Sequence, residues 1–237
     1  MTDIFLADAH LGRPDDQNYQ YLMTFLGNLK GNIRTLFLLG DIFEFWGNFK
    51  RPPHAYQPLV TLLEELAELG AQIVWVEGNH DFHLQRYFGR HKNFRILPDG
   101  GMVELGDTSV YVAHGDLVDL DNHSYLRLRR ILRSPLIALF SGFLPLALLD
   151  YIAARMKHES KKRRRSYDRQ AELLPLLNKH ATRHLDAGAA AVITGHYHTP
   201  LCRQLDGGTM IALGDWIHDF SYAEHHDGVF TLKNFPG

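Results

Sequence analysis

The 237-residue sequence has one cysteine, no excess of charge of either sign and no long apolar run. A single cysteine, Cys202, rules out an internal disulfide framework and predicts a reducing compartment. The formal net charge of -2 gives no overall field that attracts nucleic acid, so we expect no nucleic-acid partner. The N-terminus lacks a basic region followed by an apolar core, so we expect no signal peptide and a cytoplasmic location.

The most apolar stretch, Pro135 to Leu149, is shorter than the roughly 20 residues that a membrane-spanning helix needs, and Pro145 interrupts it. We therefore expect no membrane span, while peripheral contact with a membrane surface stays open. Hydrophobic content of 45% and charged content of 22% are ordinary for a globular protein. The length suits one large domain, which we place over 1–237.

The sequence does contain a series of short apolar segments that each end in polar side chains. Segments 4–7, 35–39 and 73–76 alternate with helical patterns over 19–29 and 58–69, which predicts an α/β fold with a mostly parallel sheet. The three segments are followed by Asp8 and His10, by Asp41, and by Asn79, His80 and Asp81. Functional groups gather beyond the carboxyl ends of parallel strands. Each group alone suits a polar turn, but three in succession predict a functional site.

Two later segments end in the same way. Segment 109–113 leads into His114-Gly115-Asp116, and segment 190–194 leads into Gly195-His196-Tyr197-His198. Two histidines one residue apart can point to the same side and bind one or two metals. Other strand patterns predict a second sheet region; they cover 94–97, 102–105, 209–213, 221–225 and 229–232.

The candidate metal ligands are carboxylates, imidazoles and one amide, with no thiolate. They are Asp8, His10, Asp41, Asn79, His114, His196 and His198. This donor set favours Mn, Fe or Zn, and seven ligands are too many for one such ion, so we predict two ions with Asp41 as the bridging carboxylate. Two adjacent metals suit hydrolysis of a diphosphate or phosphoester by an activated water. His80 is then free to donate a proton or to stabilise charge on the phosphoryl oxygens, so the predicted catalytic residues are His80 and Asp41.

The sequence between the fourth polar segment, 114–116, and the fifth, 195–198, has a different composition. A basic helical pattern over 125–132 precedes the apolar stretch, and five consecutive cations follow at 161–165. Alone, the run of cations is typical of a solvated helix face, and the apolar stretch is typical of a buried core helix. Together, an apolar surface flanked by cations suits an acyl chain attached to phosphate. We predict a helical lid inserted over 121–170, with a dimer interface or simple core as alternatives.

The five polar segments, in this order, resemble the five blocks of the calcineurin-like metallophosphoesterases. The resemblance implies a four-layer α/β sandwich, in which two β-sheets lie between helices, and a binuclear metal centre. It also implies how the ligands are shared: Asp8, His10, Asp41 and His198 on one metal, and Asp41, Asn79, His114 and His196 on the other.

Within that superfamily the chain is most similar to the UDP-2,3-diacylglucosamine hydrolases of lipid A biosynthesis. The similarity is carried by the length, by residues 40–46, and by the lid at 152–156 and at Ser160-Lys161. It implies attack of water on the diphosphate of UDP-2,3-diacylglucosamine, which gives 2,3-diacylglucosamine 1-phosphate (lipid X) and UMP. It also implies manganese, a lipid-linked sugar-nucleotide substrate, and a peripheral position on the inner face of the cell membrane.

The chain departs from those hydrolases at several positions. They carry arginine where this chain has His80, and of their lid contacts only the serine, Ser160, is kept. The predicted substrate contacts are Asn79, His80, Asn122, Tyr125, Ser160, Arg164, Tyr167 and His196. His80 favours the alternative, a related metallophosphoesterase that acts on another phosphodiester, phosphomonoester or nucleotide. A non-catalytic metal-binding scaffold is less expected, because it would not need all seven ligands. The sequence predicts no particular oligomeric state.

Overall fold

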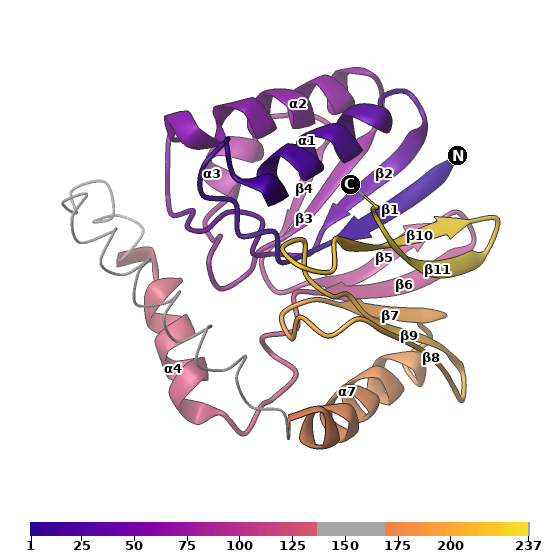
Figure 1. Ribbon diagram of the computed structural model, residues 1–237. Coiled ribbons are helices and arrows are strands. Elements are labelled where there is room, and N and C mark those ends of the chain that lie inside the picture. The colour runs from indigo at the N-terminus through magenta and orange to yellow at the C-terminus, as the bar shows by residue number, and fades with distance from the viewer. Residues whose placement is uncertain (137–168, 237) are drawn as a thin grey trace.

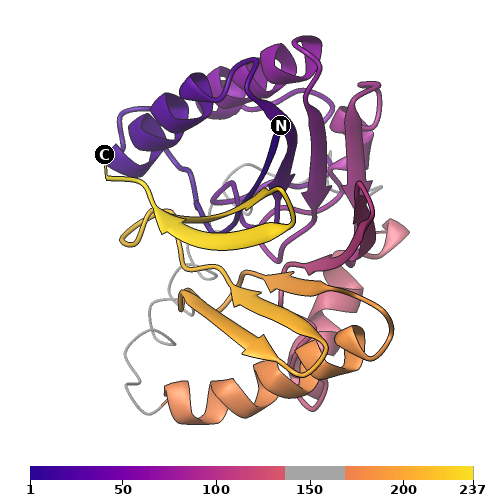
Figure 2. The same ribbon diagram turned by 90° about the vertical axis from the view of Figure 1, so that its right-hand side faces the viewer.

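Two β-sheets stack face to face, and helices cover the outer face of each sheet (Figures 1 and 2). The computed structural model describes residues 1–136 and 169–236. Viewed from the side in Figure 2, the N-terminal helices lie at the top and the orange helix α7 at the bottom, with both sheets between them. This is the four-layer arrangement that the resemblance implied, and the predicted fold class is confirmed.

The first sheet has the strand order β11-β10-β1-β2-β3-β4. Its strands are β1 (Thr2–Leu6), β2 (Ile33–Leu38), β3 (Gln72–Val76), β4 (Phe94–Leu97), β10 (Ser221–His226) and β11 (Val229–Asn234). β1 to β4 are parallel, and β10 and β11 add an antiparallel hairpin beside β1. The helical segments along this part of the chain are α1 (Gln17–Asn28), η1 (His54–Tyr56), α2 (Gln57–Glu68) and α3 (Gln85–Phe88).

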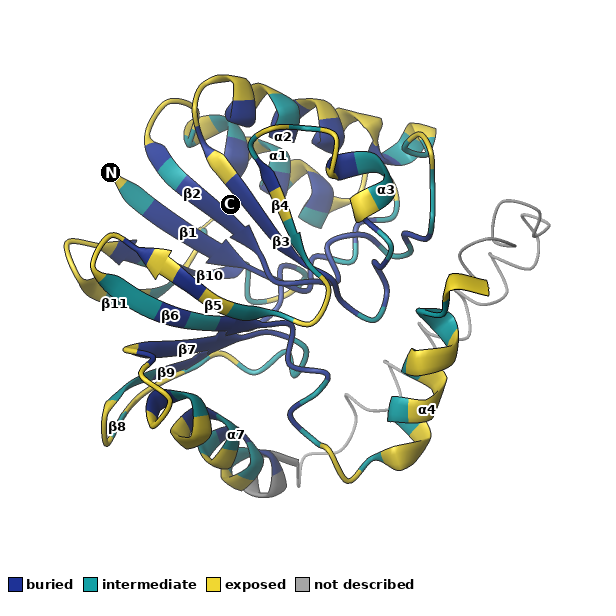
Figure 3. Cartoon of the chain, turned by 180° about the vertical axis from the view of Figure 1, so that it is seen from behind, coloured by how far each residue is buried: buried dark blue, intermediate teal, exposed yellow. Residues whose placement is uncertain are grey.

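The second sheet has the order β5-β6-β7-β9-β8. Its strands are β5 (Gly101–Leu105), β6 (Thr108–Ala113), β7 (Ala191–Thr194), β8 (Leu201–Leu205) and β9 (Gly208–Ala212). β6, β7 and β9 are parallel, and an antiparallel strand closes each edge. α7 (Arg169–Leu185) packs on the outer face of this sheet, and α4 (His123–Leu132) stands at the side of the sandwich (Figure 3).

Three apolar cores hold the four layers together, and each lies between two neighbouring layers. Leu63 of α2 and Trp75 of β3 belong to the core between the first helices and the first sheet. Phe5 and Phe37 lie between the two sheets, where their rings stack with centroids 4.4 Å apart. Leu177 of α7 belongs to the third core, beneath the second sheet. Fully burying each such side chain contributes about 1.5–3 kcal/mol, so the layers are held by burial on every face.

All the predicted strands are present, but the five polar segments come from two sheets. β1, β2 and β3 deliver three of them, and β6 and β7 of the second sheet deliver the other two. The basic helix predicted over 125–132 is confirmed as α4. The rest of the predicted lid, from residue 137 to residue 168, lies outside the described residues. Among the helices that the structure does describe, none has the length and apolar character needed to cross a bilayer.

Candidate metal centre

Five of the predicted ligands have the left-handed backbone conformation that residues other than glycine rarely adopt. They are Asp8 (φ 55°), His10 (φ 45°), Asp41 (φ 55°), His196 (φ 73°) and His198 (φ 52°). Such a conformation costs of order 1–3 kcal/mol per residue and persists where the surrounding structure enforces it, typically at functional sites. Here it turns the chain sharply at three strand ends, so that the side chains face one another.

Two glycines allow these turns to approach closely. A Cβ atom at Gly78 would contact the carboxylate of Asp41 and lie 2.5 Å from its backbone nitrogen. A Cβ atom at Gly195 would lie 2.6 Å from Cβ of Ala7 and 2.7 Å from Oδ2 of Asp8. Only glycine fits at either position, so the two Gly-containing turns are steric requirements of the centre.

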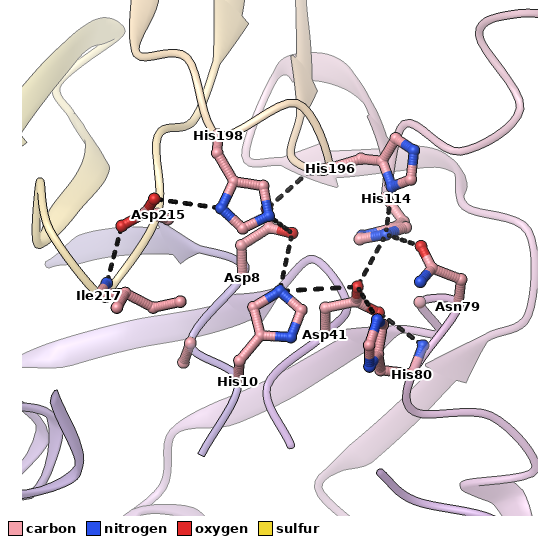
Figure 4. Close-up of polar contacts among 12 residues, drawn as sticks. Asp8, His10, Asp41, Asn79, His80, His114, His196, His198, Asp215 and Ile217 are labelled. Carbon is pink, nitrogen blue, oxygen red and sulfur yellow. Dashed lines mark hydrogen bonds and ion pairs between the residues drawn. The ribbon is translucent and has the colours of Figure 1, made fainter. Parts of the chain in front are cut away.

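The first ligand group surrounds a buried carboxylate oxygen of Asp8 (Figure 4). Its Oδ1 lies 3.5 Å from Nε2 of His198 and 3.9 Å from Nε2 of His10. Oδ1 of Asp8 and Nε2 of His10 are both buried without a hydrogen-bond partner among the described residues. A buried polar atom left unpaired costs about 1–3 kcal/mol. A divalent cation bound between these atoms would satisfy both, so the residues fit the metal that the family implies.

The second group meets the first at Asp41. Oδ2 of Asp41 lies 3.9 Å from Nε2 of His10 and 3.6 Å from Nε2 of His114. Nε2 of His114 in turn lies 3.1 Å from Oδ1 of Asn79 and 3.1 Å from Nδ1 of His196. The carboxylate of Asp41 therefore lies between the two groups, as a bridging ligand requires.

Three overlapping sets of side chains have ligand atoms within 4.8 Å of one another. They are Asp8, His10 and His198; His10, Asp41 and His80; and Asp8, Asp41 and His114. The described carboxylate and imidazole clusters are thus compatible with a divalent metal site.

Burial and mutual charge shift the pKa values of the cluster strongly. Burial raises the pKa of Asp8 to about 6. Burial alone would also raise the pKa of Asp41, but the charge of His114 and two other imidazoles holds it well below its usual value. Burial opposes protonation of His114, yet Asp41 and Asp8 raise its pKa to about 9. Burial and the neighbouring His114 lower the pKa of His196 to about 3. Because metal ligation needs a neutral imidazole, an ion bound here competes with the proton on His114.

His80 faces the same centre with one ring nitrogen. Its Nδ1 lies 2.9 Å from the carbonyl oxygen of Glu44, which accepts a hydrogen bond from Nδ1–H, so Nε2 is the nitrogen directed toward the centre. Nε2 lies 3.9 Å from Oδ2 of Asp41. The backbone N–H of His80 donates to Oδ1 of Asp41 at 2.8 Å, so the same residue also orients the bridging carboxylate.

The sequence profile of the calcineurin-like phosphoesterase family matches residues 1–200. The chain belongs to this family. It is 28% identical to a Psychromonas ingrahamii protein named UDP-2,3-diacylglucosamine hydrolase, over 100% of this chain and 98% of the relative. It is 31% identical to a protein of the same name from Stenotrophomonas maltophilia, over 98% of each chain. A solved archaeal phosphodiesterase shares the fold at a TM-score of 0.51, with 13% identity, and the match covers 98% of this chain and 99% of that one.

Two carboxylates of this calcineurin-like centre were not given a role by the sequence. Asp81 accepts hydrogen bonds from the backbone N–H groups of Gly78 (2.9 Å), Asp41 (2.9 Å) and Ile42 (2.8 Å), and so ties the turn after β3 to the turn after β2. Oδ2 of Asp215 lies 3.1 Å from Nδ1 of His198. A signal for Asp215 was available, because it follows β9 in a Gly-Asp pair like the one that ends in Asp41.

The predicted substrate contacts divide into three groups. Asn79, His80 and His196 lie in the phosphoesterase centre itself. Asn122 caps α4 by accepting a hydrogen bond from the backbone N–H of Tyr125 at 3.2 Å, and the Tyr125 ring lies 6.4 Å from the His196 ring. The remaining three, Ser160, Arg164 and Tyr167, lie outside the described residues. All eight stay predictions as substrate contacts.

Proposed function

We propose that the protein hydrolyses UDP-2,3-diacylglucosamine to 2,3-diacylglucosamine 1-phosphate and UMP. The observation that carries this proposal is the full-length similarity to hydrolases of that name, at 31% identity over 98% of both chains. Carboxylate and imidazole side chains that suit a divalent metal gather at one place among the described residues. These features together support a catalytic protein over a binding scaffold.

In this proposal the cluster holds two manganese ions. One set of ligands is Asp8, His10, Asp41 and His198, and the other is Asp41, Asn79, His114 and His196. When bound, the two cations neutralise charge on the diphosphate and make hydroxide available near neutral pH. The buried position of Asp8 and Asp41 supports this arrangement, since divalent cations would place positive charge beside two carboxylates in a dry site.

His80 is the proposed charge-stabilising group for the phosphoryl oxygens. It is 2% exposed, and Glu44 fixes its ring so that Nε2 faces Asp41. With Nδ1–H donated to Glu44, the ring offers Nε2–H to a phosphoryl oxygen in its doubly protonated form. A donor held in a dry site needs no reorganisation as charge develops, and removing one such donor costs about 10²–10³-fold in rate. The buried, pre-oriented ring of His80 supports this role.

The membrane surface at the cytoplasmic face is the proposed place of action. Leu128 and Ile131 of α4 are 53% and 54% exposed, and Arg130 on the same helix is also exposed. Apolar side chains beside cations suit the surface of an anionic bilayer. A helical lid inserted over 121–170 within a single domain completes the proposal, and helix α4 falls within these bounds.

A related metallophosphoesterase with another phosphoester substrate is the second candidate, and His80 favours it. The deciding experiment incubates purified protein with Mn²⁺ and either UDP-2,3-diacylglucosamine or bis-p-nitrophenyl phosphate, and measures UMP and p-nitrophenol. We expect UMP release that disappears in an Asp41→Asn variant run in parallel. Cleavage of the aryl diester without release of UMP would reject the lipid substrate in favour of the second candidate.

A further inference from the structure

Helix α4 is tied by buried ion pairs to two loops that carry predicted metal ligands. One loop follows β3 and contains Asn79, and the other follows β6 and contains His114. Figure 1 shows α4 at the edge of the sandwich, away from both sheets. Long side chains connect the helix to the two loops. Two of these are the arginines Arg129 and Arg133, whose side chains are each only 13% exposed.

Arg133 holds the backbone immediately before Asn79. Its Nη2 donates to the carbonyl oxygen of Gly78 at 2.7 Å and to that of Glu77 at 3.2 Å. Its Nη1 lies 3.3 Å from the carboxylate of Glu77, a side chain that is 6% exposed. The carbonyl of Gly78 and the nitrogen of Asn79 share one rigid peptide plane. Arg133 therefore sets the orientation of the peptide from which the Asn79 side chain departs.

Arg129 holds the loop that carries His114. Its Nε donates to Oδ2 of Asp116 at 2.7 Å, and the hydroxyl of Tyr125 donates to the same oxygen at 2.5 Å. Asp116 is 3% exposed and stands two residues after His114. Oδ1 of Asn79 lies 3.1 Å from Nε2 of His114, so the two loops held by α4 meet at this pair of ligand atoms.

The two guanidinium groups are already occupied by protein acceptors. Arg129 and Arg133 line a cavity of about 680 Å³, but their nitrogens face carbonyl oxygens and the carboxylates of Glu77, Asp99 and Asp116. An anionic ligand would have to displace the buried pairs with Glu77 and Asp116. Because breaking a buried pair is strongly destabilising, the arrangement does not suit a phosphate-binding site. It suits a structural connection between the helix and the ligand loops.

We propose that Arg133 and Arg129 are positioning residues that hold Asn79 and His114 in place for the second metal ion. This inference rests on the binuclear centre of the proposed function. Asp8, His10 and His198, the proposed ligands of the other ion, follow β1 and β7, whereas the arginines hold the loops after β3 and β6 that carry Asn79 and His114. The position of α4 thus sets the affinity for one ion of the two.

The test is a calorimetric Mn²⁺ titration of the metal-free full chain, without substrate, for wild type, Arg133→Met, Arg133→Lys and Arg127→Met. Arg127 is the matched control, since it is exposed on the same helix and has no polar partner among the described residues. We expect Arg133→Met to weaken one Mn²⁺ site about 10–100-fold, as loss of a ligand-orienting partner does, and to leave the other unchanged. Arg133→Lys keeps the positive charge but cannot contact two acceptors in the same geometry. Its Mn²⁺ affinity at this site should therefore fall between those of wild type and Arg133→Met.

Two sites of wild-type affinity in Arg133→Met would overturn the inference. Equal weakening of both sites, together with a lower unfolding temperature of the metal-free variant, would also overturn it, because it indicates a general loss of structure. The titration contains no substrate, so a wild-type chain that binds two ions but releases no UMP rejects the substrate and leaves this inference intact. A wild-type chain that binds a single Mn²⁺ overturns the binuclear centre and the inference together.

Discussion

Nδ1 of His198 lies 3.1 Å from Oδ2 of Asp215, and Nε2 of the same ring lies 3.5 Å from Asp8. The carboxylate thus fixes the ring so that the opposite nitrogen faces the metal centre. Asp215 is itself held by the backbone N–H groups of Ile217 (2.8 Å) and His218 (2.6 Å). Its pKa is held below the usual value, because these donors and His198 outweigh the effect of burial. Asp215 is therefore ionised over the physiological range and available to orient His198.

Asp215→Asn should weaken Mn²⁺ binding about 10–100-fold, because the amide no longer fixes the orientation and basicity of His198. Calorimetric titration of the metal-free protein measures the effect. Asp206→Asn, an exposed substitution in the turn between β8 and β9, is the control and should bind Mn²⁺ as wild type does. Unchanged affinity in Asp215→Asn would show that His198 needs no partner.

The sequence was sufficient to single out the candidate metal ligands, because each follows an apolar strand whose pattern is local. β8 was missed for the opposite reason. Residues such as Cys202 and Arg203 are exposed at the sheet edge, so the strand has no alternation of apolar and polar side chains. Its extended conformation is stabilised by antiparallel pairing with β9. α7 was also missed, since Pro175 interrupts the helical pattern even though Leu177 and Ala181 pack on the second sheet.

The contacts between segments far apart in the chain could not be predicted from local patterns. The backbone N–H of His196 donates to Oδ2 of Asp8 at 2.7 Å, across the interface between the two sheets. Arg133 likewise donates to the carbonyl oxygen of Gly78, 55 residues earlier in the chain. Such pairs depend on how the sheets stack and on where α4 stands, and no periodicity in a single sequence encodes either.

Stability should depend on pH through Asp3, a buried carboxylate far along β1 from the metal centre. Burial raises its pKa, but hydrogen bonds from Arg34 and His225 reverse the shift and leave the pKa below the ordinary aspartate value of 3.8. A folded-state pKa that is depressed adds stability above the unfolded pKa, and this is lost as the pH falls through the folded value. Arg34→Met should therefore be less stable than wild type at neutral pH, and the difference should shrink below about pH 3.8.

Urea unfolding of the metal-free proteins between pH 3 and pH 7 measures this difference. The matched control is Lys30→Met, which removes an exposed pair with Glu65 and should change stability little at any pH. A stability difference between wild type and Arg34→Met that is constant over this range would show that packing of the arginine stem, and not the charge of Asp3, is responsible.

Asp41→Asn should reduce hydrolysis by at least about 10²–10³-fold, because the bridging position loses its charge while the side chain keeps its shape. Chelation of metal from the wild type should abolish turnover, and added Mn²⁺ should restore it. Asp107→Asn, in the exposed turn between β5 and β6, serves as the control and should retain wild-type turnover. Retained turnover in Asp41→Asn would reject the binuclear mechanism.

The two roles open to His80 make different predictions for different leaving groups. A diphosphate releases a phosphate monoester, a weak base that departs without a proton, and p-nitrophenolate does the same. An alkyl phosphodiester releases a strongly basic alkoxide, which needs a general acid. Because Glu44 fixes Nδ1 and directs Nε2 toward Asp41, we expect His80 to stabilise charge on the phosphoryl oxygens.

His80→Gln should then lower kcat about 10²–10³-fold for UDP-2,3-diacylglucosamine and for bis-p-nitrophenyl phosphate alike, with the Mn²⁺ stoichiometry unchanged. A parallel kcat measurement with a dialkyl diester adds a strongly basic leaving group to the series. A methyl p-nitrophenyl diester, which also releases p-nitrophenolate, controls for the group that stays on phosphorus. An equal loss of kcat for every leaving group would show that His80 stabilises charge on the phosphoryl oxygens. A loss that grows with the basicity of the leaving group would instead assign proton donation, and would favour a phosphodiester over a diphosphate as the substrate for which this histidine is suited.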